Sequence, residues 1–262
     1  MQNRPFSPEV IFTSIPALLP YLLVTLKVGL ISILTGSILG MLLAWAKLSS
    51  HKVLRCAADG YTYVIRCTPS IVLLFIVFYG LPKWMEFAFA IYIDDLSRAV
   101  FVIITFMLLF GAYVSEVFRS AYLAVPKGQY EAAVTIGLSP LSAFIHVMLP
   151  QAAVIALPNF GNSVINLLKE SALAYTIGLI DLLGRTNRII AKNYGGYGIE
   201  LYTASMILYW ALSIVIERSF LKLETSLSHE TKNELKGGQA LLELWTILLG
   251  KKGRFRSLFR FW

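Results

Sequence analysis

The chain has 262 residues, of which 57% are hydrophobic and only 15% are charged, and its mean hydropathy is +0.69. A soluble domain carries about 25% charged residues, so this composition excludes an ordinary soluble protein. The net charge of +8 would suggest nucleic-acid binding in a soluble protein. In a membrane protein, Lys and Arg collect in cytoplasmic loops instead. We therefore expect an all-α membrane protein that lies in a lipid bilayer and does not bind nucleic acid.

Long uncharged apolar runs predict about five transmembrane helices. A helical span needs about 20 largely apolar residues. The expected spans cover residues 18–46, 63–82, 98–122, 150–172 and 200–221. They form one permeation domain over 18–225. We expect an extracellular segment over 1–17 and a basic, aromatic-rich cytoplasmic tail over 226–262.

The distribution of Lys and Arg predicts the orientation of these spans. Basic residues follow the first and fifth spans and flank the third, which places those ends in the cytoplasm. The N-terminus is then outside and the C-terminus inside. One loop disagrees, because Arg185, Arg188 and Lys192 would lie outside.

The end of the chain, residues 251–262, reads KKGRFRSLFRFW. Such a mixture of basic and aromatic residues is typical of a segment at anionic lipid headgroups, although a disordered basic tail explains it equally well. The two cysteines and three histidines have no metal-ligand spacing, so we expect no metal site.

The polar stretch between the third and fourth spans, residues 127–150, predicts two short helices joined by a tight break. Gly137 can adopt the left-handed conformation that ends a helix. Ser139 and Pro140 then supply an N-cap and a first helical residue. A compact helical hairpin between spans is a plausible docking surface for a soluble partner.

The fourth span carries most of the candidate chemistry. Asn159, Asn162, Asn166 and Lys169 follow steps of three and four residues and therefore share one helix face; Glu170 and Ser171 adjoin it. Such groups within a membrane face a bundle interior or a water-filled cavity. An ammonium, a carboxylate and amides suit a zwitterionic amino acid. The alternative is that these residues form interhelical hydrogen bonds.

Other features limit the choice of function. Glu116 and Arg119, one helical turn apart in the third span, are expected to form an interfacial ion pair. The chain has no GxxxxGK[ST] phosphate loop, and no GxSxG or HExxH motif. An energy source for transport would therefore lie in another subunit.

The hairpin resembles the EAA loop of permease subunits in bacterial ATP-binding-cassette (ABC) importers. That family has Glu-Ala-Ala, three residues, Gly, nine residues and Ile-x-Leu-Pro. The chain matches at Glu131-Ala132-Ala133, Gly137 and Leu149-Pro150, and differs where Val147 replaces Ile. The resemblance implies that the loop couples to a separate ATPase through Gly128, Gln129, Glu131, Ala132, Ala133 and Gly137.

Further segments resemble this family: Arg66-Cys67-Thr68-Pro69, Tyr79-Gly80-Leu81-Pro82, and Ala112-Tyr113 with Glu116 and Arg119. Two others are typical of its polar amino acid branch, Pro126-Lys127-Gly128-Gln129 before the Glu-Ala-Ala motif and Leu168-Lys169-Glu170-Ser171. The resemblance implies a bacterial inner-membrane importer driven by two ATPase subunits, which would bind the ATP and Mg. It also implies a second permease copy or paralogue, an external amino-acid-binding protein and no cofactor in this chain. The substrate passage would use Asn159, Asn162, Asn166, Lys169, Glu170 and Ser171.

Two other classes of function remain open from the residues alone. An ion-coupled secondary carrier could use the polar face of the fourth span, but it has no use for an EAA loop. A membrane-embedded enzyme would need a paired nucleophile and base or a metal cluster, and the sequence has no motif for either.

Overall fold

The computed structural model describes the backbone of residues 6–248 and the side chains of residues 6–227. Within this range the regular elements are helices, and five helical segments are long and apolar enough to cross a membrane. The predicted all-α membrane fold is therefore confirmed. The described residues divide into two compact units between Phe220 and Leu221. The basic, aromatic segment over 251–262 lies outside the described residues.

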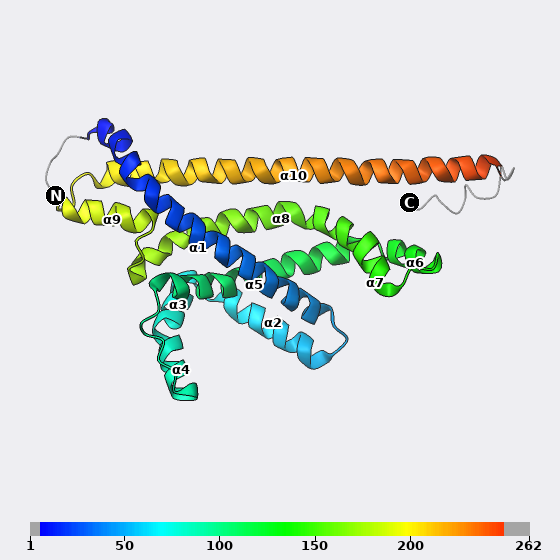
Figure 1. Cartoon of the computed structure of the whole chain (residues 1–262), viewed down its shortest axis with the longest axis horizontal. Coiled ribbons are helices and arrows are strands. Elements are labelled where there is room, and N and C mark those ends of the chain that lie inside the picture. Colours follow the sequence, from blue (N-terminus) through cyan, green and yellow to red (C-terminus); the bar gives the residue numbers. More distant parts are fainter. Residues whose placement is uncertain (1–5, 249–262) are drawn as a thin grey trace. The chain divides into compact units, whose positions relative to one another are not determined.

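The helices follow one another in the order shown in Figure 1. They are α1 (Pro8–Leu48), α2 (Lys52–Cys67), α3 (Ser70–Phe75), α4 (Leu81–Phe89), α5 (Arg98–Ala124), α6 (Lys127–Thr135), α7 (Pro140–Ala143), α8 (Leu149–Glu170), α9 (Leu182–Lys192) and α10 (Gly198–Leu248). Two π-helical turns, η1 (Ile76–Gly80) and η2 (Phe144–Met148), join α3 to α4 and α7 to α8. The segment η3 (Ser171–Ile177) is a 3-10 helix.

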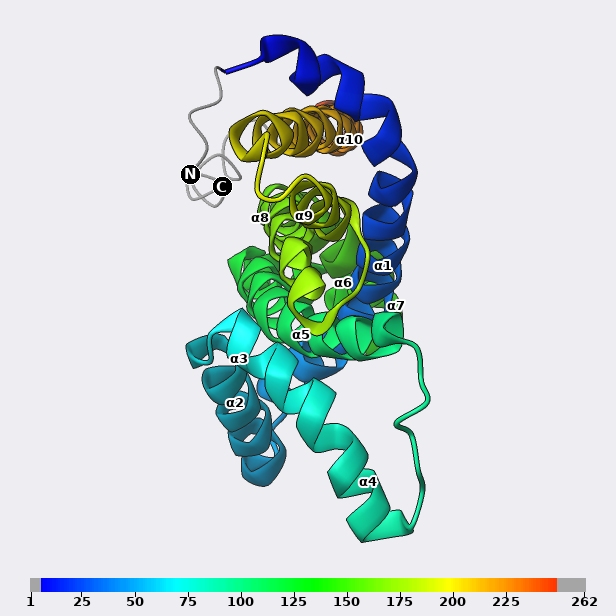
Figure 2. The same cartoon turned by 90° about the vertical axis from the view of Figure 1, so that its left-hand side faces the viewer.

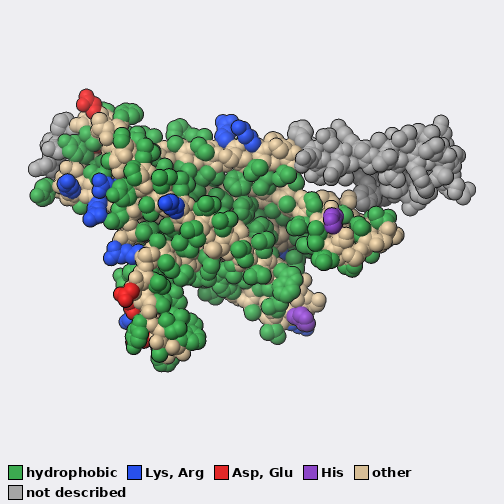
Figure 3. Space-filling model, viewed as in Figure 1, with side chains coloured by type: hydrophobic (Ala, Val, Ile, Leu, Met, Phe, Trp, Pro, Cys, Tyr) green, Lys and Arg blue, Asp and Glu red, His purple; other side chains and the backbone are tan. Residues whose placement is uncertain are grey.

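Helix α5 forms the centre of the first unit. Its side chains Phe101, Phe106 and Phe110 are almost completely buried, and α1, α2 and α8 pack around it. Helix α4 projects away from this bundle (Figure 2). Hydrophobic side chains cover most of the described surface in Figure 3, as expected for helices whose outer faces meet lipid.

Helices α1 and α5 approach closely because glycines line their contact. A Cβ atom on Gly36 would lie 3.0 Å from the carbonyl oxygen of Met107, and one on Gly40 would lie 3.2 Å from that of Gly111. A Cβ on Gly111 would lie 2.8 Å from Leu39. Small residues at such contacts let helix backbones pack tightly within a membrane.

Replacement of Gly36 by leucine should therefore destabilise the protein. Overpacking of this kind costs about 1–3 kcal/mol, so the midpoint of thermal unfolding in detergent should fall. Gly60→Leu is the matched control, because no atom lies within 4 Å of a Cβ at Gly60 of α2 and leucine favours a helix more than glycine does. Equal midpoints for the two variants would contradict the close packing.

The second span begins later than the sequence predicted. We expected it to start at residue 63, but α2 ends at Cys67 and α3 begins at Ser70. Thr68 is extended, with φ −88° and ψ 129°, because the ring of Pro69 disfavours helical geometry in the residue before it. The amphipathic α2 is therefore a separate helix that packs on α1 and α5.

Other boundaries also differ from the prediction. The first helix begins at Pro8 rather than at 18, and the last continues beyond the expected end at 221 to Leu248. The loop expected over 184–199 contains much of α9. Asp181 caps this helix, since its carboxylate accepts a hydrogen bond from the backbone N–H of Gly184 at 2.8 Å. The sequence carried this N-cap signal, which our prediction overlooked.

Candidate functional site

The hairpin between the third and fourth spans has the predicted geometry. Gly137 is left-handed, with φ +98°, and ends α6. Its N–H donates to the carbonyl of Val134 at 3.0 Å, and the N–H of Leu138 donates to that of Ala133 at 3.2 Å. This pair of bonds is the Schellman motif, which satisfies the last carbonyls of a helix.

The following helix also starts as predicted. Ser139 is the N-cap of α7, and its hydroxyl accepts a hydrogen bond from the N–H of Ser142 at 3.2 Å. Pro140 occupies the first turn, where its missing N–H costs nothing. The turn of the hairpin is thus fixed by hydrogen bonds on both sides of Gly137.

The hairpin exposes several of the residues expected to couple to a partner. Glu131, Ala132 and Gly137 are exposed, whereas Gly128 and Gln129 are half-buried and Ala133 is buried. Two apolar side chains that the sequence did not single out are also exposed, Ile136 at 81% and Leu141 at 68%. A carboxylate beside exposed apolar groups is a surface suited to a protein partner.

The other side of the hairpin is anchored to the spans. Val125, Met148 and Ala152 form a buried cluster against which Tyr122 and Tyr130 pack. This cluster joins the end of α5 to α6 and to the start of α8. A hollow of about 210 Å³ beside it is lined in part by Tyr130 and Glu131. The hairpin is therefore packed directly against the end of α5 and the start of α8.

The polar face of α8, defined as Asn159, Asn162, Asn166 and Lys169, is exposed in the single chain. A hollow of about 300 Å³ lies between α5 and α8. The structure brings Asn166, Lys169 and Glu170 together in its lining. Asn159 and Asn162 are outside that lining, and Ser171 is buried with its hydroxyl donating to the carbonyl of Leu168 at 2.7 Å.

The structure adds residues to this hollow that our sequence analysis did not assign to the passage. Tyr113 and Ser163 line it. Ser70, at the start of α3, donates its hydroxyl hydrogen to the carboxylate of Glu170 at 3.0 Å. The guanidinium of Arg66 lies 5.6 Å from the ring centre of Tyr113, within the range of a cation–π contact. The family motifs at residues 66–69 and 112–113 could have pointed to these residues in the sequence.

Comparison with known proteins identifies the family. Residues 36–229 match the family model described as "Binding-protein-dependent transport system inner membrane component". The chain belongs to this family. The match covers the helices from within α1 into α10, including the hairpin and the polar face of α8.

Curated relatives and solved structures agree with this assignment. The permease is 36% identical to the L-cystine transport system permease protein TcyL of Bacillus subtilis (strain 168), over 83% of this chain and 90% of that protein. It is 32% identical to the putative glutamine transport system permease protein GlnP of Rickettsia felis (strain ATCC VR-1525 / URRWXCal2), over 80% of this chain and 90% of that protein. A structure titled as an amino acid ABC transporter with histidines matches with a TM-score of 0.74, at 28% identity, covering 85% of this chain and 100% of that chain. The MetNI methionine ABC transporter shares the fold, with a TM-score of 0.60 at 18% identity.

The prediction of a transporter permease subunit, rather than an enzyme, is thus confirmed. Among the side chains described for residues 6–227, no group of His, Cys, Asp and Glu could hold a metal ion. Outside our predicted passage, the permease has charged side chains buried at two further sites.

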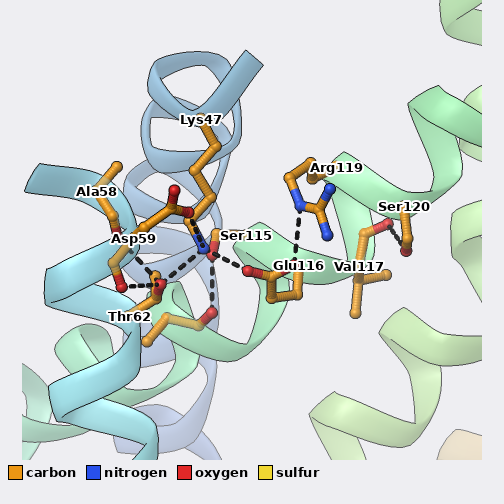
Figure 4. Close-up of polar contacts among 10 residues, drawn as sticks. Lys47, Ala58, Asp59, Thr62, Ser115, Glu116, Val117, Arg119 and Ser120 are labelled. Carbon is orange, nitrogen blue, oxygen red and sulfur yellow. Dashed lines mark hydrogen bonds and ion pairs between the residues drawn. The ribbon is translucent and has the colours of Figure 1, made fainter. Parts of the chain in front are cut away.

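The first site joins α1, α2 and α5 (Figure 4). The predicted pair is present, since Nε of Arg119 lies 2.9 Å from a carboxylate oxygen of Glu116. Lys47, one of the basic residues that follow the first predicted span, is buried in the structure. Its side chain is 1% exposed and forms an ion pair with the other oxygen of Glu116. Sequence periodicity gave no signal for this contact between distant segments.

The second site lies where α9 meets α1 and α10. Asp181 is 1% exposed, and burial raises the pKa of its carboxyl to about 6. Its second carboxylate oxygen is buried without a hydrogen-bond partner. The guanidinium of Arg185 lies 5.1 Å from the ring centre of Tyr21, so one of the basic residues that disagreed with our orientation packs against α1.

The stability of the folded protein should therefore fall as the pH rises through the range in which the buried Asp181 carboxyl loses its proton. The folded state binds this proton more tightly than the unfolded state, whose pKa is near 3.8. The free energy of unfolding should decrease by about 3 kcal/mol between about pH 4 and pH 6 and stay level above. Asp181→Asn retains an N-cap acceptor and removes the charge, so it should raise the unfolding midpoint at neutral pH and flatten this dependence.

The measurement is thermal unfolding in detergent across that pH range, with the exposed Asp95→Asn as the control. A wild-type curve parallel to that of Asp181→Asn between pH 4 and 6 would contradict the buried, proton-binding carboxyl.

Proposed function

We propose that this permease imports an α-amino acid in an ATP-driven complex, with the polar face of α8 as its substrate passage. The observation that carries the proposal is the hollow between α5 and α8 that holds Lys169, Glu170 and Asn166 together. An ammonium can bind the carboxylate of a zwitterion, a carboxylate can bind its ammonium, and an amide can donate or accept for either. Ionisable groups placed in a membrane span are typical of a substrate pathway.

The relatives support the chemical class. The names of the two curated relatives refer to L-cystine and glutamine. The solved amino acid ABC transporter is described as a structure with histidines. These compounds differ in their side chains and share the α-amino and α-carboxylate groups. Lys169 and Glu170 are proposed to recognise that shared part.

The hairpin supports a partner ATPase. Its exposed Glu131, Ile136 and Leu141 form a surface for a soluble subunit, and the cluster at Val125 and Met148 ties that surface to the spans. Two ATPase subunits, one for each permease copy, would bind the ATP and Mg. Gly128, Gln129, Glu131, Ala132, Ala133 and Gly137 are the proposed coupling residues.

The exposed polar face of α8 supports a second permease subunit. Asn159 and Asn162 are exposed within a membrane helix, and polar side chains are unfavourable against lipid. A second copy or paralogue that covers this face would enclose the passage. An external amino-acid-binding protein would deliver substrate, and the complex would lie in the bacterial inner membrane with the hairpin in the cytoplasm.

Reconstitution tests this function against the ion-coupled carrier. The permease, purified with its ATPase and placed in proteoliposomes with its binding protein, should take up ¹⁴C-labelled amino acids, tested with L-cystine and L-glutamine among others, only when ATP is available to the ATPase. Uptake driven by a proton or sodium gradient without ATP would contradict the proposal.

A further inference from the structure

The ion cluster in Figure 4 connects helices that the proposed passage and the hairpin use separately. Lys47 lies in the last turn of α1. Its ammonium donates a hydrogen bond to the hydroxyl of Thr62 in α2 at 2.7 Å and lies 3.8 Å from the carboxylate of Asp59. It also bonds the carboxylate of Glu116 in α5. One buried side chain thus joins the end of α1 to the middle of α2 and to the C-terminal part of α5.

The charges of the cluster balance. Lys47 and Arg119 are positive, and Asp59 and Glu116 are negative. Glu116 uses one oxygen for each cation. Removing an ammonium from water has a large free-energy cost, which ion pairing often does not recover beyond what apolar packing would provide. The cluster is therefore a weak source of stability. Unlike apolar packing, it fixes the relative position of three helices through directional bonds.

The cluster lies on the direct route from the hairpin. Glu116 and Arg119 belong to the last turns of α5, which ends at Ala124 and leads through the buried Val125 into α6. Close packing extends to the same end of α1, since a Cβ on Gly40 would lie 3.3 Å from the backbone nitrogen of Ser115. Movement of the hairpin would reach the cluster through the end of α5.

Helix α2 continues this route to the passage. Near the middle of α2, Thr62 accepts a hydrogen bond from Lys47 and Asp59 forms an ion pair with it. Its last turn carries Arg66, which lies over the ring of Tyr113 in the wall of the hollow. Ser70, the first residue of the next helix, α3, donates a hydrogen bond to the carboxylate of Glu170. Helix α2 is thus attached to the ion cluster and, through Arg66, to the wall of the hollow, and it leads over two residues to Ser70.

We propose that Lys47 is a positioning residue for transport. By fastening α2 to α1 and α5, it makes the passage residues attached to α2 follow the movement of the hairpin. This inference rests on the proposed function. A contiguous set of contacts shows a physical route, and coupling itself needs a functional measurement.

The test is the number of amino acid molecules imported per ATP hydrolysed in proteoliposomes, with both rates normalised to assembled complex. Lys47→Met keeps the apolar stem and removes the ammonium. ATP hydrolysis should continue while the number of amino acid molecules imported per ATP falls severalfold. Lys47→Arg, which keeps the charge, should restore part of the ratio.

Two other variants complete the design. Lys27→Met makes the same substitution at an exposed position of α1 and should leave the ratio unchanged. Thr62→Val removes the acceptor of Lys47 at nearly constant volume, and should lower the ratio in the same direction by a smaller factor. If the Lys47→Met variant does not assemble with the ATPase, the Thr62→Val variant alone tests the positioning role of Lys47.

The outcomes separate this inference from the proposed function. A wild-type number of molecules imported per ATP in both Lys47→Met and Thr62→Val would overturn the positioning role of Lys47. A parallel fall of uptake and ATP hydrolysis, with the number imported per ATP unchanged, would also overturn it, because that result indicates a merely structural role. In both cases ATP-driven uptake by the wild type would leave the proposed function intact. Absence of ATP-driven uptake in the wild type would overturn both.

Discussion

Replacement of Gly137 by valine should separate the permease from its ATPase while leaving the spans folded. Gly137 has φ +98°, a conformation that is a genuine outlier for a β-branched residue and costs about 1–3 kcal/mol. No atom lies within 4 Å of a Cβ at this position. The effect would therefore come from the backbone of the turn, and not from steric crowding.

We expect ATPase association to weaken by about tenfold, the change that corresponds to about 1.4 kcal/mol, and binding-protein-stimulated hydrolysis to fall with it. Co-purification and ATPase assays measure both. Gly137→Asn is the matched control, because asparagine adopts the left-handed conformation more readily than most residues, and it should retain most of the activity. If valine and asparagine behave alike at wild-type levels, the hairpin does not dock the ATPase.

Removal of the charge at Lys169 should have the largest effect on substrate recognition. Lys169→Met keeps much of the apolar stem, and the exposed position can accept it without repacking. If the ammonium binds the substrate carboxylate, loss of that hydrogen bond costs about 1.5–3 kcal/mol. The apparent affinity for uptake should then fall by about tenfold or more.

Glu170→Gln tests the opposite charge in the same hollow. Glutamine can still accept the hydrogen bond from Ser70, so a loss of uptake would reflect the missing charge. Lys192→Met, at an exposed position of α9, is the control for a lost lysine. Uptake kinetics normalised to assembled complex are the measurement. Normal affinity with reduced assembly would favour interhelical hydrogen bonds over a passage.

The sequence predicted those elements whose determinants are local. Five apolar segments were recognised, and the turn at Gly137 with its Ser139 cap was predicted in detail, because left-handed glycine and N-caps act over a few residues. The start of the second span was wrong, since the break depends on Pro69 and its effect on Thr68. Helix α9 was missed because it is short and amphipathic, and its cap at Asp181 was overlooked.

The candidate site was predictable to a similar extent. Helical spacing put Asn166 and Lys169 on one face of α8, and both line the hollow. That spacing could not reveal that Ser70 bonds Glu170 or that Tyr113 lines the same hollow, because these residues belong to distant segments. The burial of Lys47 was hidden for the same reason, since a lysine at the end of a span is typical of a cytoplasmic boundary.

Labelling of a single cysteine at Asn166 would test the central claim most directly. In a permease carrying Asn166→Cys, with the exposed Cys56 and Cys67 replaced by serine, a membrane-impermeant thiol reagent is added from either side, without nucleotide and with ATP trapped in the ATPase. Ile155→Cys, on the same helix and 42% exposed, reports on a position outside the polar face. We predict that residue 166 reacts from one side only in each state and that the reactive side changes with nucleotide, while residue 155 shows no such change. Labelling of residue 166 that is the same in both states, or that requires a lipid-soluble reagent, would contradict a substrate passage along the polar face of α8.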